Sequence, residues 1–217
     1  MDFELARFNM VEQQIRPWNL FDENILNLLH TLKRENFVTT ELRNLALSDV
    51  ELPLPGGLHM LFPRIEARLL QELQLKKTDK VLQIGTGSGY VTALLAKLTD
   101  FVYSIEINSQ NYQFAVNNLA NAGIKNISLI EGDGSKGLAT KQPFDKIFIG
   151  ASVGTVSQEI KQQLKIGGRL VAIEGTAPIM HAVVVTRISE HEFQHQQLFE
   201  TKLEALINYS EVTNFSL

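Results

Sequence analysis

The chain has 217 residues, 44% of them hydrophobic and 20% charged, which is the composition of a globular protein able to bury a sizeable core. Its formal net charge of -4 lacks the basic footprint of a nucleic-acid-binding protein, so no nucleic-acid partner is expected. The absence of cysteine excludes a disulfide framework, a thiolate zinc site and a cysteine nucleophile.

The first five residues, Met1-Asp2-Phe3-Glu4-Leu5, carry acids where a signal peptide needs basic residues and an apolar run. No stretch approaches the roughly 18 consecutive apolar residues that a membrane-spanning helix needs. We therefore expect a cytoplasmic protein that has no membrane partner. The sequence leaves its oligomeric state open.

Residues 1–78 show no alternation of strands and helices and are predicted to form an N-terminal helical cap that includes a substrate loop. The first helix is expected to end near Pro17 and to bury Leu5, Phe8, Val11 and Ile15. Asp22 is the predicted N-cap of a second helix, whose apolar stripe consists of Ile25, Leu28, Leu29 and Leu32. A third helix is expected to start at Pro63 and to bury Ile65, Leu69 and Leu73.

The segment between the second and third helices, residues 51–62, is predicted to be irregular. It contains two prolines and two glycines, followed by apolar residues that show no period. Loops of this kind, held by regular elements on both sides, often carry the contacts to a substrate.

From residue 79 the pattern changes to alternating strands and helices, which predicts a mostly parallel sheet with helices on both faces. The expected strands are 81–84, 101–106, 127–130, 144–149 and 169–173, with helices at 88–98, after Asn108, and at 157–164. The helix after Asn108 is expected to bury Tyr112, Ala115, Val116 and Leu119. Gly167-Gly168 should turn the chain from the last helix into the strand that follows.

Two further strand-like runs, 181–187 and 192–199, have no helix between them and are expected to pair as an antiparallel hairpin at one edge. The predicted fold class is therefore α/β: a Rossmann-like, doubly wound, mostly parallel sheet with an antiparallel edge and an N-terminal helical cap. Residues 79–217 would form this core with its edge strands and C-terminal tail. No linker separates it from residues 1–78, so one compact unit is expected.

Three alternating glycines, Gly85, Gly87 and Gly89, follow the first strand of this sheet and lead into a helix. Glycine has no Cβ, so a ligand can approach the main chain there, and the helix directs its free N–H groups into the same space. A tight turn without a ligand is the alternative, because a glycine loop on its own is a weak signal.

The spacing of the glycines distinguishes among the possible cofactors. A dinucleotide loop has the pattern GxGxxG, whereas here the third glycine comes one residue early and Tyr90 takes the packing position. Glu106 ends the next strand, about 20 residues further on, where a carboxylate can accept both ribose hydroxyls of a nucleoside. Both features favour S-adenosylmethionine over NAD, and the lack of a Gly-Lys-Ser or Gly-Lys-Thr sequence after the loop excludes a P-loop.

Ligands of such sheets bind beyond the carboxyl ends of the strands, where the strand order reverses. We expect the glycine loop to hold the methionine part of the cofactor and Glu106 its ribose, while Asp133 accepts from the adenine amino group or belongs to an ordinary Asp-Gly turn. Gln83, just before the loop, is neutral and pairs with a cation only weakly. The predicted cofactor-binding residues are Gly85, Thr86, Gly87, Ser88, Gly89, Glu106, Ile107, Asp133 and Gly134.

Several segments in register resemble the protein-L-isoaspartate O-methyltransferase family, and together they cover most of the chain. They are 9–16 (NMVEQQIR), 34–38 (RENFV), 81–90 (VLQIGTGSGY), 131–137 (EGDGSKG), 143–147 (PFDKI) and 164–170 (LKIGGRL). The resemblance implies a methyltransferase fold, S-adenosylmethionine as methyl donor, and a protein or peptide acceptor. The acceptor group would be the carboxyl of an isomerised aspartate in a damaged protein.

The chain departs from the family pattern at three places. Aligned on Pro63, the family's threonine-isoleucine-serine run becomes His59-Met60-Leu61, so Leu61 replaces a serine whose hydroxyl holds the acceptor. The family's alanine-alanine-proline run becomes Ala151-Ser152-Val153, and its loop begins with an acid where this chain has Gln83. The acceptor loop, with Leu58, Met60 and Leu61, is therefore expected to differ from the family.

Two alternatives remain open at this stage. One is a methyltransferase of the same fold with another acceptor: a hydroxyl acceptor needs a base, for which His59 is the candidate catalytic residue, although an ordinary loop or partly buried histidine is the favoured interpretation. The other is a binding module that keeps the cofactor pocket and uses Leu58, Met60, Leu61 and Phe62 as an exposed apolar patch for a protein partner.

Overall fold

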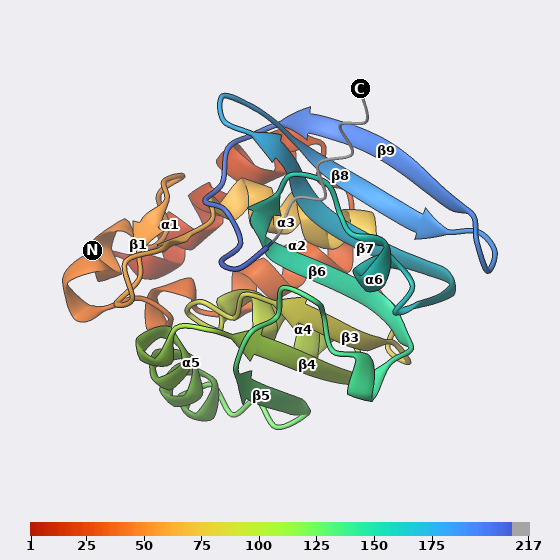
Figure 1. Ribbon diagram of the computed structural model, residues 1–217. Helices are drawn as coiled ribbons and strands as arrows, with labels where there is room; N and C mark the ends of the chain where they lie inside the picture. The colour runs from red at the N-terminus through yellow and green to blue at the C-terminus, as the bar shows by residue number, and fades with distance from the viewer. Residues whose placement is uncertain (210–217) are drawn as a thin grey trace.

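The computed structural model describes residues 1–209 and places seven strands in one sheet, in the order β5-β4-β3-β6-β7-β8-β9 (Figure 1). The strands are β3 (Lys80–Ile84), β4 (Phe101–Glu106), β5 (Ile127–Glu131), β6 (Phe144–Val153), β7 (Leu164–Thr176), β8 (Ile179–Arg187) and β9 (Phe193–Glu200). The first five strands in this order, β5, β4, β3, β6 and β7, pair in parallel. Strands β8 and β9 are added at one edge as antiparallel strands. The predicted fold class and edge hairpin are confirmed. The predicted tail extends into residues 210–217, which lie outside the described residues.

Both faces of the sheet are buried along its central strands, and each face has its own hydrophobic cluster. On β7, Val171 and Ile173 belong to the cluster beneath the larger helices, and Leu170 and Ala172 belong to the cluster on the opposite face. Because neighbouring residues of a strand point to opposite faces, a strand buried on both sides has an unbroken apolar sequence. This explains why β7 and β8 appear as continuous apolar runs.

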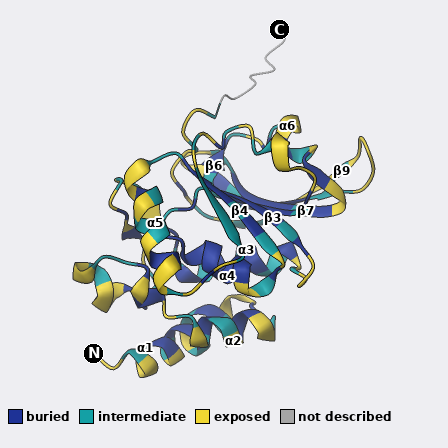
Figure 2. Cartoon of the chain, turned by 90° about the horizontal axis from the view of Figure 1, so that it is seen from below, coloured by how far each residue is buried: buried dark blue, intermediate teal, exposed yellow. Residues whose placement is uncertain are grey.

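The two faces are covered unequally. One side carries five helices (Figure 2): α1 (Phe3–Asn9), α2 (Glu23–Thr31), α3 (Pro63–Leu73), α4 (Tyr90–Leu98) and α5 (Ser109–Asn121). The short α6 (Gln158–Lys161) lies on the other side (Figure 2). The first cluster runs without interruption from the cap into the sheet and includes Met10, Leu29, Leu70, Leu94 and Phe148. None of the helices in residues 1–209 is long and apolar enough to cross a membrane.

The cap starts differently from the expected single helix. Helix α1 (Phe3–Asn9) continues as a π-helix (Met10–Ile15) and then as a 3₁₀ turn (Arg16–Trp18) that contains Pro17. The wider π turn changes the phase of the helix, so the prediction that Leu5 and Phe8 are buried is wrong: Leu5 is 57% exposed and Phe8 is exposed as well. Arg7 is buried instead, on a salt bridge to Glu35.

The second and third helices agree with the pattern. Helix α2 (Glu23–Thr31) is capped by Asp22, whose side chain accepts from two backbone N–H groups, and α3 has Pro63 at its first turn. Short 3₁₀ segments (Arg34–Asn36, Thr40–Leu45 and, later, Ala139–Lys141) link the regular elements. Residues 51–62 are irregular as predicted, apart from two-residue strands β1 (Leu52–Pro53) and β2 (His59–Met60), which pair antiparallel.

The region between β6 and β7 is a second difference. The expected helix over 157–164 is reduced to α6, for which Ser157 is the N-cap, and β7 already starts at Leu164. Phe144 pairs with Leu164 but Lys146 pairs with Arg169, so Gly167-Gly168 lies in a bulged part of β7 instead of ending a helix.

The corrected cap gives a stability test. Ile15→Ala, which empties a fully buried position, should lower the free energy of unfolding by about 2 to 5 kcal/mol. Leu5→Ala, at an exposed position of the same helical segment, should change it by less than about 0.5 kcal/mol. Urea denaturation followed by circular dichroism measures both, and an equal loss in the two variants would contradict the phase change at the π-helix.

Candidate ligand and acceptor site

The glycine loop lies where the strand order of the sheet reverses. It follows β3, which has β4 on one side and β6 on the other, and it leads directly into α4. Gly85, Gly87 and Gly89 all have positive φ, at 85°, 57° and 84°, so the loop depends on residues that tolerate this conformation. A Cβ on Gly89 would also lie 2.9 Å from Leu119 Cδ1, because α5 packs directly against the loop.

Glu106 is held firmly beside this loop. It ends β4, is 4% exposed, and its carboxylate accepts from the backbone N–H groups of Gly87 (2.8 Å) and Asn108 (2.9 Å). Each carboxylate oxygen has a further lone pair for a ligand hydroxyl. Glu106 is therefore fixed in position and can still accept from a ligand.

The side chain of Gln83 is committed to the protein. Its Oε1 accepts from Thr92 Oγ1 (2.7 Å) and Ser104 Oγ (3.1 Å), and its Nε2 donates to the carbonyl of Gly85 (3.1 Å). A carboxylate has no N–H with which to make the last of these bonds. Gln83 therefore braces the start of the loop and adds no charge to the site.

Two asparagines on α5 were missed by the sequence pattern. Asn111 and Asn118 are buried where Tyr112 and Val116 were expected, and these two are only half-buried. Asn118 Nδ2 donates to the carbonyl of Ser88 (2.9 Å), and Asn111 Oδ1 accepts from the N–H of Gly56 (2.9 Å). The signal available in the sequence was three asparagines, 108, 111 and 118, at spacings that put them on one helix face.

The loop of residues 51–62 covers the glycine loop from the cap side. A small pocket of about 40 Å³ lies between them. Its lining residues are Leu54, His59, Met60, Leu61, Glu66, Gln83, Gly85, Thr86, Gly87, Ser88, Val91, Phe148 and Gly150. The structure thus brings four of the predicted cofactor residues together with the candidate acceptor residues, whereas Leu58, Gly89, Glu106, Ile107, Asp133 and Gly134 lie outside this lining.

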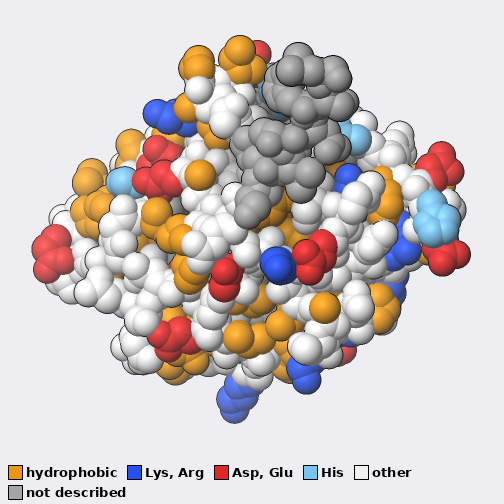
Figure 3. Space-filling view, in the orientation of Figure 1, with side chains coloured by type: hydrophobic (Ala, Val, Ile, Leu, Met, Phe, Trp, Pro, Cys, Tyr) orange, Lys and Arg blue, Asp and Glu red, His pale blue; other side chains and the backbone are white. Residues whose placement is uncertain are grey.

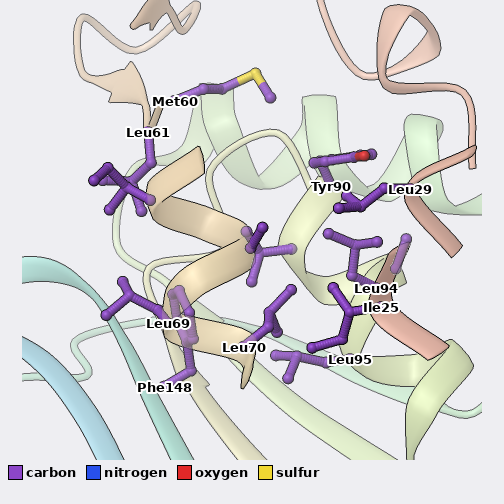
Figure 4. Close-up of a cluster of buried hydrophobic side chains, with 14 of the residues drawn as sticks. Ile25, Leu29, Met60, Leu61, Leu69, Leu70, Tyr90, Leu94, Leu95 and Phe148 are labelled. Carbon is purple, nitrogen blue, oxygen red and sulfur yellow. The ribbon is translucent and has the colours of Figure 1, made fainter. Parts of the chain in front are cut away.

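The apolar residues of the acceptor loop form a pocket wall. Leu61 is 7% exposed, Met60 is buried, and Leu58 and Phe62 pack partly buried against the core. Figure 4 shows Met60 and Leu61 above α3, whose Leu69 and Leu70 point into the same cluster as Phe148. The exposed patch expected for the binding-module alternative is therefore not formed, because the loop turns these side chains inward.

Arg34 anchors the acceptor loop from within the cap. Its guanidinium is fully buried and donates to the carbonyls of Leu61 (2.8 Å) and Ala46 (2.9 Å), and to both oxygens of Glu66 at 3.3 Å. Burial raises the pKa of Glu66, and the neighbouring Arg34 opposes that rise. The position of the Leu61 main chain is thus set by a buried charge.

His59 lies at the rim of the pocket. Its Nδ1 is 2.8 Å from Glu204 Oε1, its backbone N–H donates to the other oxygen of Glu204 (3.1 Å), and its side chain is 40% exposed. Glu204 belongs to the segment after β9, which is held by the main chain and hydroxyl of Ser152. The C-terminal segment therefore reaches the acceptor loop.

Asp133 and Gly134 follow β5. Asp133 is exposed; its Oδ1 accepts from the N–H of Ser135 (2.8 Å) and its Oδ2 from Asn208 Nδ2 (3.1 Å), and the bond from the Ser135 backbone lowers the pKa of the Asp133 carboxyl. Gly134 is buried, and a Cβ there would lie 2.9 Å from Ile84 Cγ2. Gly134 thus lets the turn after β5 pack closely against Ile84 at the end of β3.

The charged side chains on one face of the molecule are mixed in sign (Figure 3). On the face that Figure 3 shows, acidic and basic side chains are interspersed, and hydrophobic atoms lie between them. Within residues 1–209, no group of three or more His, Asp or Glu side chains is arranged to hold a metal ion. The site is built from backbone amides, an apolar wall and two buried carboxylates, Glu106 beside the glycine loop and Glu66 in the pocket lining.

The family of Protein-L-isoaspartate(D-aspartate) O-methyltransferases (PCMT) matches residues 7–208. A protein-L-isoaspartate O-methyltransferase of Koribacter versatilis is 38% identical over 205 residues, which are 94% of this chain and 92% of that protein. One of Petrotoga mobilis is 40% identical over 191 residues, which are 88% of this chain and 90% of that protein.

A solved structure from Plasmodium falciparum, described as a protein-L-isoaspartate O-methyltransferase in complex with S-adenosyl-L-homocysteine, has the same fold. Its TM-score is 0.80 at 18% identity, and the match covers 95% of this chain and 98% of that one. With the family match over residues 7–208, these likenesses extend over both the cap and the sheet. The chain belongs to the protein-L-isoaspartate(D-aspartate) O-methyltransferase family.

Proposed function

We propose that this protein transfers the methyl group of S-adenosylmethionine to the carboxyl group of an isomerised aspartate in a protein or peptide. The observation that carries the proposal is the fixed Glu106 carboxylate beside a positive-φ glycine loop, in a chain of this family. We assign residues 1–78 to a cap that presents the acceptor loop and residues 79–217 to the cofactor-binding core.

The residues present fit S-adenosylmethionine. Gly85 to Gly89 would hold its methionine part, Glu106 would accept from the ribose hydroxyls, and Asp133 would accept from the adenine amino group, with Ile107 and Gly134 beside them. When bound, the cofactor supplies an activated methyl group on a sulfonium. The Gly87 N–H keeps the Glu106 carboxylate turned toward the loop, which supports the assignment of the ribose to this residue.

Transfer to a carboxylate is mainly a matter of positioning. A carboxyl group with a pKa of about 4 is already ionised at neutral pH, so no base is needed. The protein has to exclude water and hold the oxygen in line with the methyl group. Leu54, Met60, Leu61, Val91 and Phe148 make the required water-excluding wall, and Arg34 holds the main chain of Leu61 in place.

A hydroxyl acceptor is the second candidate, and one observation favours it. Leu61 offers no hydroxyl to an acceptor carboxylate, while His59 lines the pocket with its Nδ1 on Glu204, as in a histidine oriented to act as a base. In this alternative, Nε2 of His59 would take the proton of the acceptor.

Both acceptor candidates require that the protein binds S-adenosylmethionine, and a binding measurement tests this requirement. Glu106→Gln should weaken the affinity for S-adenosylmethionine roughly ten- to hundredfold, because a ligand-binding carboxylate becomes a neutral amide. Isothermal titration calorimetry measures the dissociation constant. Glu131→Gln is the matched control, since Glu131 lies opposite Glu106 on β5 but is exposed, and it should leave the constant within about twofold. No binding by the unmodified chain at millimolar ligand would end the proposal.

The acceptor loop gives a second test. Leu61→Ser restores a hydroxyl near the acceptor and should raise transfer of a tritiated methyl group to an isoaspartyl peptide roughly tenfold or more. Met60→Ser, which adds a hydroxyl at the neighbouring buried position, should give no gain. If neither the unmodified chain nor Leu61→Ser labels the peptide, isoaspartate is not the acceptor.

His59 separates the two acceptor classes. Because a carboxylate needs no base, His59→Asn should leave the labelling rate of an isoaspartyl peptide within about threefold, whereas general-base catalysis contributes about 10²- to 10⁴-fold. The rate is measured with the same tritium assay across pH 5 to 8. A loss of two orders of magnitude, with a pH profile that follows a histidine, would contradict transfer to a carboxylate that needs no base.

A further inference from the structure

The pocket between the glycine loop and the acceptor loop contains one carboxylate. Of its lining side chains only His59 and Glu66 are ionisable, and Glu66 belongs to α3 in the cap, outside the sheet that carries the glycine loop. Glu66 is 2% exposed and nevertheless lines the pocket. Gln83, at the other side, is neutral and fully committed to Thr92, Ser104 and Gly85.

The contacts with Arg34 leave part of the hydrogen-bonding capacity of the Glu66 carboxylate free. The shortest bonds of its guanidinium, 2.8 and 2.9 Å, go to the carbonyls of Leu61 and Ala46, and its two contacts with Glu66 are both 3.3 Å. A charge-assisted N–H···O bond is normally 2.7 to 2.9 Å long, so these two are long for an ion pair. The carboxylate retains unused acceptor capacity on a side chain that lines the pocket.

The glycine loop disfavours a cationic ligand, so a cation bound in this pocket needs an anion beside it. Gly85 to Ser88 lead into the N-terminus of α4, where the aligned peptide dipoles add partial positive charge and disfavour a cation. A cation that enters a pocket with apolar walls also loses its water, which is costly unless an anion replaces it. His59, the other ionisable group of the lining, cannot provide a negative charge.

We infer that the Glu66 carboxylate is the counter-ion for the cationic methionine part of the ligand, either its ammonium or its sulfonium group. The inference rests on the proposed use of S-adenosylmethionine and adds a residue from the cap to the predicted cofactor site. Cofactor binding would then involve the same buried Arg34–Glu66 pair that holds the acceptor loop, so that cofactor and acceptor sites share one support.

The test compares Glu66→Gln with Glu35→Gln, measuring dissociation constants by calorimetry and stability by thermal unfolding. Glu35 is the matched control because it is also a buried glutamate paired with an arginine, Arg7, but lies outside the pocket lining. The ligands are S-adenosylmethionine, S-adenosylhomocysteine, which has the ammonium but no sulfonium, and 5′-methylthioadenosine, which has neither.

Glu66→Gln should weaken the affinity for S-adenosylmethionine roughly ten- to hundredfold and leave the affinity for 5′-methylthioadenosine within about twofold. Glu35→Gln should leave both affinities within about twofold. An equal loss of affinity for S-adenosylhomocysteine identifies the ammonium as the group that Glu66 neutralises. A loss of affinity for S-adenosylmethionine alone identifies the sulfonium. Unchanged affinity, or an equal loss for all three ligands, would overturn the role of Glu66.

Should Glu66→Gln fail to fold, Glu66→Asp withdraws the carboxylate by one methylene and keeps its charge. This variant should weaken the affinity for S-adenosylmethionine at least threefold more than the affinity for 5′-methylthioadenosine. An unchanged ratio of the two affinities would overturn the inference. Absence of binding of every adenosine ligand to the unmodified chain is a different result: it refutes the proposed function and the role of Glu66 with it.

Discussion

The buried guanidinium of Arg34 is the contact on which the arrangement of this site depends. It joins the carbonyl of Ala46, the carbonyl of Leu61 and the carboxylate of Glu66, and it lies 5.4 Å from the centre of the Tyr90 ring at the start of α4. A buried cation is tolerated only when it is paired and hydrogen-bonded, so these segments have to assemble together. The cap is therefore built into the site, and its apolar residues are continuous with those beneath the sheet.

A second set of polar contacts makes the two loops of the site one unit. Asn118 donates to the carbonyl of Ser88 in the glycine loop, Asn111 accepts from the N–H of Gly56 in the acceptor loop, and the backbone N–H of Asn108 donates to Glu106. All three asparagines belong to the N-cap or buried face of α5. Because such buried groups are costly when left unpaired, α5 sets the distance between the two loops.

This construction suits a reaction that depends on positioning. The wall around the pocket is apolar, the side chain of Gln83 at the start of the glycine loop is committed to internal bonds, and the one carboxylate of the pocket lining belongs to α3. The chain departs from the family pattern at Gln83, at Ala151-Ser152-Val153, and in the candidate acceptor loop, where Leu61 takes the place of a hydroxyl. The main chain at Leu61 is nevertheless held by Arg34, so the residue has changed while its support is retained.

The sequence by itself determined the architecture, because strand and helix periods and the glycine spacing are local properties. The sheet, the N-caps Asp22 and Asn108, and the loop at Gly85 to Gly89 were all predictable. Which polar residues are buried was decided by the tertiary structure alone. Asn111, Asn118, Arg34 and Glu66 each look like surface residues until a distant partner is placed beside them, and the π-helix that exposes Leu5 has no period of its own to reveal it.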